Sequence, residues 1–165
     1  MGSRARRAPA LALLLALAAA PAWALDWGAI VPGQSTMQTV RARYGAPTRT
    51  ESQKIEGFDG TRWFYEAAQA PAGLQRLIVD YGLKPATGFR PDLVRSFLLE
   101  PKPRIFDRRI VVSGWGPPER IGKENGADVY LYEEGLLVYF DKDGWNVRAL
   151  MFTPPQPLPP AAPQR

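Results

Sequence analysis

Side chains that could do covalent chemistry are few in this chain. Its 165 residues include neither histidine nor cysteine, which excludes a Ser-His-Asp triad, a cysteine nucleophile and an ordinary zinc site. Two carboxylate pairs remain, Glu133 with Glu134 and Asp141 with Asp143, and paired carboxylates can act as general acid and base in a hydrolase. Both pairs fall in predicted tight turns, where solvated hairpin residues are the simpler interpretation, and the aspartates are too few for a calcium loop. We therefore expect no enzyme, no cofactor and no metal.

The first two dozen residues have the pattern of an export signal. Arg4, Arg6 and Arg7 precede an apolar stretch over residues 8–20, and Ala22-Trp23-Ala24 is typical of a signal-peptidase site. The stretch is too short for a permanent transmembrane helix, and no second apolar segment of spanning length follows. An uncleaved amphipathic anchor is the alternative, but residues 8–24 carry no charge that would form a polar face. We expect residues 1–24 to be a signal peptide, cleaved after Ala24, and the product to be periplasmic or secreted.

Removal of that leader leaves 141 residues, enough for one domain with a real core. The precursor has a net charge of +5, and three of its arginines lie in the leader, which leaves +2. The remaining charges alternate in sign, so a nucleic-acid partner is not expected. Leu25 stands where a lipoprotein needs cysteine, so no lipid anchor is expected. We predict a folded domain over residues 25–153 and a Pro-rich, disordered tail over 155–165.

The mature chain contains an internal repeat. An aromatic residue, a glycine, a proline and an arginine recur at matching positions, and four later landmarks follow in the same order. The matching segments are Tyr44-Gly45-Ala46-Pro47-Thr48-Arg49 with Trp115-Gly116-Pro117-Pro118-Glu119-Arg120, residues 63–66 with 130–133, residues 77–81 with 136–140, Val94-Arg95 with Val147-Arg148, and Pro101 with Pro154. The repeats are predicted to cover about residues 30–101 and 103–154.

Each repeat has the pattern of one capped helix followed by three antiparallel strands. Ser35 or Thr36 can cap the first helix and Asp107 the second, and a glycine with a following proline ends both helices. The later segments alternate with period two and are separated by turn residues. The predicted fold class is therefore α+β, with two tandem repeats of a helix and a three-stranded antiparallel sheet, and with the helices on one face.

The alternation also predicts which sheet face is open. Arg95 and Arg148 occupy matching positions, and we take both to point to water. This phase places Val94, Ser96, Leu98, Val147, Ala149 and Met151 on the helix side. The residues predicted to form a protein-binding face are Ile78, Asp80, Arg95, Phe97, Leu137, Tyr139, Arg148 and Leu150. Such an apolar, aromatic face either binds a partner or is buried between the two halves.

These motifs resemble the SmpA/OmlA family of the envelope-assembly lipoprotein BamE, together with the related β-lactamase inhibitor protein. The carrying residues are Pro32-Gly33-Gln34-Ser35-Thr36, the segment 44–47, Trp63 with Tyr65, and the strand 77–81, and the likeness extends over residues 30–152. The resemblance implies a non-catalytic module whose helices cover one side of a sheet while the other side meets a protein, and two tandem copies are closer to the inhibitor. The chain lacks BamE's lipidated cysteine and the inhibitor's disulfides.

The predicted function is thus an exported protein-binding module of the cell envelope, which uses an aromatic-rich sheet face. A secreted inhibitor of the β-lactamase-inhibitor type is one alternative, and a carboxylate-dependent hydrolase is another. In the first hypothesis Tyr139 anchors the partner, while Arg148 and Asp80 fix its register.

Overall fold

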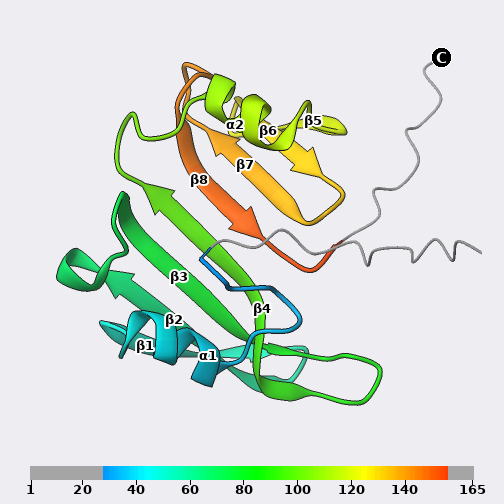
Figure 1. The fold of residues 1–165 in the computed structure, drawn as a ribbon. Coiled ribbons are helices and arrows are strands. Elements are labelled where there is room, and N and C mark those ends of the chain that lie inside the picture. Colours follow the sequence, from blue (N-terminus) through cyan, green and yellow to red (C-terminus); the bar gives the residue numbers. More distant parts are fainter. Residues whose placement is uncertain (1–27, 156–165) are drawn as a thin grey trace, which may run out of the picture.

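The structure, a computed structural model, describes residues 28–155. The predicted leader with its cleavage site, and the predicted tail beyond Pro155, lie outside the described residues. Two short helices and eight strands make up the fold (Figure 1). Their bounds are α1 Met37–Tyr44, β1 Arg49–Ile55, β2 Phe58–Glu66, the 3-10 turn Ala67–Gln69, β3 Leu74–Leu83, β4 Arg90–Pro101, α2 Arg108–Trp115, β5 Arg120–Glu124, β6 Ala127–Tyr132, β7 Leu136–Phe140 and β8 Val147–Phe152.

All eight strands belong to one antiparallel sheet, in the order β1-β2-β3-β4-β8-β7-β6-β5. The first half of the molecule, residues 28–101, contributes β1 to β4, and the second half, residues 102–155, contributes β5 to β8. The two halves join where β4 pairs with β8. The prediction of two tandem repeats of a helix and three strands is therefore wrong: the fold is a single eight-stranded sheet with two short helices.

The strands that the sequence did not reveal are the outer strands of this sheet. β1 has the sequence RTESQKI and β5 has RIGKE, and most side chains of both are exposed. A strand that is wet on both faces needs no apolar alternation, so period-two patterning cannot detect it. Both strands are instead held by tight hairpins to their neighbours β2 and β6.

Both helices begin and end at the predicted residues. The side chain of Thr36 accepts a hydrogen bond from the backbone N–H of Thr39, and that of Asp107 accepts one from Ile110. Gly45 and Gly116 follow the last helical residues with φ of 79° and 80°, a conformation that favours glycine. These stops leave two-turn helices, which are stabilised mainly by packing on the sheet.

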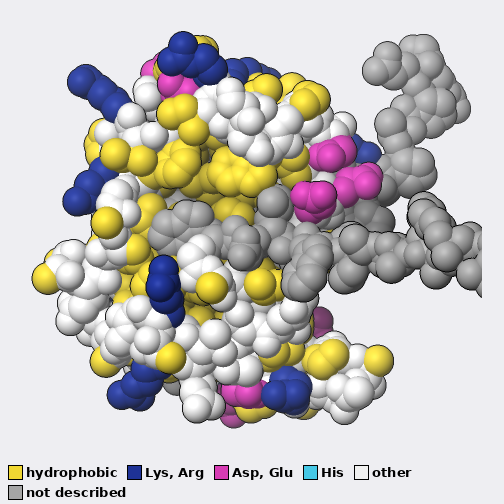
Figure 2. Space-filling model, in the orientation of Figure 1, with side chains coloured by type: hydrophobic (Ala, Val, Ile, Leu, Met, Phe, Trp, Pro, Cys, Tyr) yellow, Lys and Arg dark blue, Asp and Glu magenta, His cyan; other side chains and the backbone are white. Residues whose placement is uncertain are grey.

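One hydrophobic core lies between the helices and the sheet. Val40 of α1 and Val111 of α2 are fully buried in the same cluster, which also includes Phe97 and Phe152 from the two central strands. The rings of these phenylalanines stack at 4.6 Å between centroids, so the core is continuous across the junction of the halves. Both helices lie on the same side of the sheet (Figure 1). Figure 2 shows apolar side chains gathered between the two halves on the face drawn there.

Two β-bulges decide which side chains point away from the helices. Asp80 pairs with Ser96 but Tyr81 pairs with Val94, so Arg95 is an extra residue in β4. In the same way Tyr139 pairs with Ala149 but Phe140 pairs with Val147, so Arg148 is an extra residue in β8. A bulge shifts the alternation by one residue, and every side chain beyond it changes face relative to a regular strand.

The predicted face assignment is therefore wrong beyond each bulge. Phe97 and Leu150, predicted for the open face, are each 1% exposed in the core. Leu98 and Met151, predicted for the helix side, share their cross-strand row with Ile78 and Leu137 on the opposite face. Val94 and Val147, which precede the bulges, are buried as predicted.

In the described part of the chain, no helix is both long enough and apolar enough to cross a membrane.

Candidate functional site

One row of cross-strand partners runs through all eight strands on the face opposite the helices. Its members follow directly from the pairing registers: Arg49, Phe64, Ile78, Leu98, Met151, Leu137, Leu131 and Arg120. We call this face the open face, and the six apolar residues between the two arginines the apolar row. Cross-strand neighbours lie about 5 Å apart, so these side chains form one continuous strip.

The apolar row is accessible along most of its length. Ile78, Leu98, Met151 and Leu137 are all partly exposed, and the helices pack on the other side of the sheet (Figure 1). At one end the guanidinium of Arg49 lies 3.3 Å from the centre of the Phe64 ring and covers it, which leaves Phe64 4% exposed. An accessible aliphatic strip of this length is unusual for a solvated sheet face.

In the first half of the molecule, a polar network borders the apolar row. Asp80 is 8% exposed and accepts hydrogen bonds from Arg62 Nε at 2.6 Å and Arg62 Nη2 at 3.1 Å. Gln53 and Ser96 also donate to its carboxylate. The bond to Asp80 raises the pKa of the Arg62 guanidinium, so Arg62 keeps its positive charge. Because these polar groups bind one another, that part of the open face presents no apolar surface to a partner.

Arg95 is the loosest member of this network. Its Nη2 atom lies 3.8 Å from Asp80 Oδ2, and its Nε atom is buried without a hydrogen-bond partner among the described residues. The bulge therefore places the guanidinium at the edge of the network, where its hydrogen-bonding capacity is only partly used.

In the second half, the corresponding positions are apolar. Tyr139 pairs across the strands with Val129 and Ala149, and its hydroxyl lies 4.0 Å from the sulfur of Met151. Burial raises the pKa of the Tyr139 phenol, so the ring is neutral near pH 7. Tyr139 thus extends the apolar row sideways into a broader patch.

Arg148 borders that patch. Its guanidinium lies 5.7 Å from the centre of the Tyr139 ring and donates to Glu124 at 2.9 Å. Both charged side chains are about half exposed, at 57% and 48%. A hollow of about 280 Å³ opens beside them, lined by Leu98, Glu100, Glu124, Tyr139, Arg148, Ala149 and Met151. Arg148 also lines two neighbouring hollows, of about 440 and 280 Å³.

The remaining candidate carboxylates have structural surroundings. Glu133 and Glu134 are exposed in the turn between β6 and β7. Asp143 accepts a hydrogen bond from the backbone N–H of Trp145 at 2.7 Å and orders the turn before β8. Burial, and then the neighbouring Asp143, raise the pKa of Asp141. The side-chain hydrogen bond with Asp141 lowers the pKa of Asp143. Among the described residues, no three carboxylates gather in a group that could hold a metal ion.

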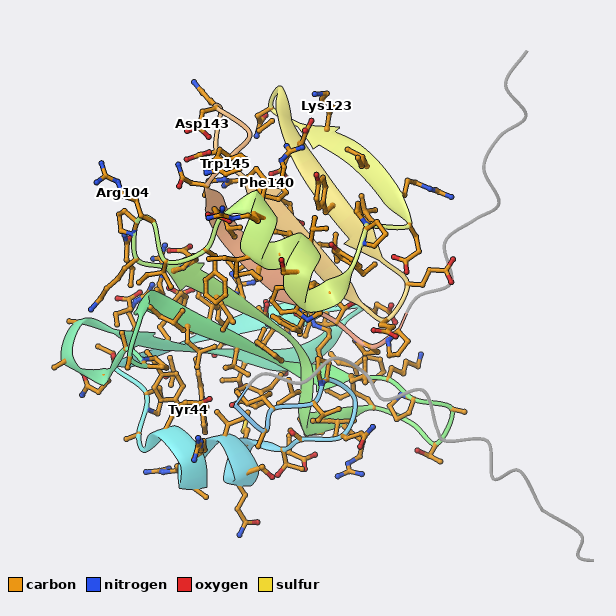
Figure 3. All side chains as sticks on the ribbon, turned by 45° about the horizontal axis from the view of Figure 1, so that its top comes forward. Tyr44, Arg104, Lys123, Phe140, Asp143 and Trp145 are labelled. Carbon is orange, nitrogen blue, oxygen red and sulfur yellow. The ribbon has the colours of Figure 1, made fainter. Side chains whose placement is uncertain are left out.

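Asp143 and Trp145 lie at the far end of the second half, close to Lys123 (Figure 3). These residues line a polar hollow of about 450 Å³. Asp128 in this hollow accepts hydrogen bonds from Lys123 at 2.6 Å and from Arg108 at 2.7 Å, and these bonds lower its pKa. Arg108 also donates to the carbonyl of Gly144. The charges are paired with one another and tie α2 to the sheet, which is a structural arrangement.

Of the eight predicted site residues, the structure brings six to the open face: Ile78, Asp80, Arg95, Leu137, Tyr139 and Arg148. The other two, Phe97 and Leu150, are in the core. Sequence reasoning missed Leu98 and Met151, because the bulges invert the alternation that it relied on. It assigned Phe64 and Leu131 to neither face of the sheet. Arg49 and Arg120 occupy matching positions in the repeat. This match is the sequence signal from which the row between the two arginines could have been found.

Over residues 28–155, fold and site together define a single antiparallel sheet with one helix-covered face and one open face. Comparison with solved structures finds a DUF4309 family protein, YjgB, from Bacillus subtilis, with 14% sequence identity, a TM-score of 0.49, and coverage of 76% of this chain and 82% of that one. No family model and no curated protein matches the chain. The resemblance to the SmpA/OmlA and β-lactamase-inhibitor group is corrected by the fold itself: the described residues form mostly one eight-stranded sheet, and not two tandem repeats of a helix and a three-stranded sheet.

Proposed function

We propose that this chain is an exported, non-catalytic protein-binding module, and that a protein partner docks on the open face of the second half. The observation that carries the proposal is the apolar row that runs across the six inner strands of the sheet on the side away from the helices. Burying such a strip against another protein would gain about 25 cal/mol for each Å² removed from water.

The chemistry of the face favours a folded protein surface over other ligands. Arginines and carboxylates alternate around the apolar row, as in the pairs Arg62 with Asp80, Arg76 with Glu100 and Arg148 with Glu124. A nucleic acid would need a face of one positive sign. An interface with an apolar centre and a rim of mixed charge is the usual anatomy of protein recognition.

Within that face, the second half offers the better anchor. Tyr139, Met151 and Leu137 are contiguous and partly exposed, and the hollow next to Arg148 can receive a side chain of the partner. Aromatic residues and arginine at the centre of an interface carry most of the binding energy. Export is proposed from the leader-like residues 1–24, and secreted enzyme inhibition would be one use of the same surface.

Site-specific photocrosslinking in the native compartment tests this proposal. A photoreactive residue at position 137 or 151 is expected to crosslink to one protein, whereas the same residue at Ser113, which is exposed on α2, is expected not to. The substitution Tyr139→Asp should abolish the crosslink from position 137, because it places a charge at the centre of the interface. Equal crosslinking from positions 137 and 113, or a product that persists in the Tyr139→Asp chain, would refute the assignment of this surface.

A further inference from the structure

The two outer strands of the sheet differ in what their free edges could pair with. β1 and β5 end the strand order, and each is bonded to one neighbour only. Unpaired strand edges are templates for adding a further strand unless their side chains prevent it. The question is therefore which strand sequence either edge would accept.

The β5–β6 hairpin fixes which backbone groups of β5 face outward. Its turn residues Asn125 and Gly126 have φ of 52° and 83°, both positive, as in a two-residue type I′ turn. The pair that flanks such a turn, Glu124 with Ala127, is hydrogen-bonded, and bonded pairs alternate along an antiparallel ladder. The backbone groups of Arg120, Gly122 and Glu124 therefore face β6, whereas those of Ile121 and Lys123 face outward.

These outward groups fit a second copy of the same strand. If two β5 strands run antiparallel about a two-fold axis at Gly122, Ile121 stands opposite Lys123 of the second copy, and their outward N–H and C=O groups can form two hydrogen-bonded pairs. In the same register Arg120 stands opposite Glu124 of the second copy, on both sides of the axis. The strand RIGKE is thus complementary to itself in both hydrogen bonding and charge.

We propose that the outer edge of β5 is a self-association surface, through which two copies pair their β5 strands about Gly122. Opposite charges directly across an antiparallel pair stabilise it, and here the symmetry provides two such pairs. Glu124, which already receives a hydrogen bond from Arg148, would bridge two guanidinium groups. On the other face Ile121 is 56% exposed, and the aliphatic stem of Lys123 from the second copy would cover it.

The opposite edge does not have this complementarity. In the full-length two-fold register of β1, centred on Ser52, Arg49 stands opposite Ile55 and Thr50 opposite Lys54, with no pair of opposite charges. We therefore expect pairing through β5 and not through β1. Because five residues bury little area, the dimer should be weak, and it would double the length of the sheet without covering the open face.

A disulfide trap tests the geometry directly, because the chain contains no cysteine. In the proposed register, Gly122 and its copy form a non-hydrogen-bonded pair about 4.5 Å apart at Cα, which lies within the range that a disulfide spans. A Cβ at this position meets only a Leu131 methyl group at 3.4 Å, so Gly122→Cys fits the fold. Under mild oxidation, Gly122→Cys should form a covalent dimer, and the matched control Ser52→Cys should remain monomeric.

Charge reversal tests the register. In sedimentation equilibrium of the cysteine-free chain, Arg120→Glu should raise the dimer dissociation constant about tenfold, because it places like charges opposite each other. The double variant Arg120→Glu, Glu124→Arg should regain most of the affinity, and circular dichroism of each variant checks that it is folded. Equal oxidation of the two cysteine variants, a wild-type chain that stays monomeric at about 1 mM, or no recovery in the double variant would overturn the proposal.

Discussion

The two halves of this molecule share one framework and differ on the face that the framework presents. In each half a capped helix ends at a glycine in the left-handed region, and a tyrosine from the second strand donates to that glycine's carbonyl. In each half a bulge also places an arginine in the last strand. The corresponding positions are Thr36 and Asp107, Gly45 and Gly116, Tyr65 and Tyr132, and Arg95 and Arg148.

The open faces of the two halves differ in chemistry. Next to the apolar row, the first half places Glu51, Arg62, Asp80 and Ser96 in one cross-strand row. The second half places Gly122, Val129, Tyr139 and Ala149 at the matching positions. In the first set Arg62 and Ser96 donate hydrogen bonds to Asp80, whereas the second set is apolar and its largest side chain, Tyr139, is partly exposed.

This difference separates what builds the fold from what can bind. Helix caps, helix-ending glycines and bulges are required by the conformation and hydrogen bonding of the main chain. Both halves therefore need the same residue types at the same places. A side chain that points away from the core is not under those demands. The half whose open face stays apolar is therefore the half in which we place partner binding.

The largest expected effect tests the assignment of faces on which this comparison depends. Phe97→Ala should cost about 3 to 5 kcal/mol of unfolding free energy, because it empties the junction where Phe97 stacks on Phe152. Its neighbour Leu98→Ala should cost less than about 1.5 kcal/mol, because Leu98 is already partly exposed. Urea denaturation measures both. Equal losses would mean that the bulge at Arg95 does not set the faces.

The next effect separates the polar from the apolar open face. Asp80→Ala should cost about 2 to 3 kcal/mol, because it leaves the Arg62 guanidinium and the side-chain amide of Gln53 without their shared acceptor. Tyr139→Ala, at the matching position, should cost about 1 kcal/mol and should abolish partner crosslinking. Chemical denaturation and the crosslinking assay distinguish the two. A Tyr139→Ala chain as unstable as the Asp80→Ala chain would show that both faces serve folding alone.

A smaller effect concerns the framework that the halves share. Tyr65→Phe and Tyr132→Phe should each cost about 1 kcal/mol, because each removes one hydrogen bond to a helix-ending glycine. Burial raises the pKa of Tyr65 and of Tyr132 from 10.0 to about 12. The neutral phenol is therefore favoured in the folded state, and stability present below about pH 10 is lost as the pH rises toward 12.

Stability curves at neutral and alkaline pH measure this effect. Each Phe variant should lose less stability between pH 10 and 12 than the wild-type chain, since it has one phenol fewer to ionise. If only one of the two variants behaved in this way, the tyrosine contact would not contribute equally to the stability of the two halves.

The smallest effect concerns the bulge arginines themselves. Arg95→Ala and Arg148→Ala should each change the unfolding free energy by less than about 1 kcal/mol, since the ion pairs of both residues are loose or exposed. Thermal unfolding measures this change. Only Arg148→Ala should weaken partner crosslinking. An equal loss of crosslinking in the Arg95→Ala chain would extend the binding surface into the first half.

The sequence predicted those parts of the molecule that leave a local signature. Thr36 and Asp107 cap helices and Gly45 and Gly116 end them, because caps and left-handed glycines are determined by neighbouring residues. The edge strands β1 and β5 could not be predicted from alternation, because neither strand buries a regular face. The bulges could not be predicted either: an extra residue is a property of two paired strands, and neither strand shows it alone. Because the bulges were not predicted, Phe97 and Leu150 were placed on the open face, where the structure has Leu98 and Met151 instead.

Cysteine accessibility gives the most direct test that the open face is exposed in the free protein and covered by a partner. Since the chain has no cysteine of its own, Met151→Cys and Phe152→Cys each introduce one thiol, on the open face and in the core respectively. We predict that maleimide labels position 151 rapidly in the purified native protein and slowly in the native compartment, while position 152 stays unreactive in both. Equal labelling of position 151 in the two settings, or rapid labelling of position 152, would contradict the account.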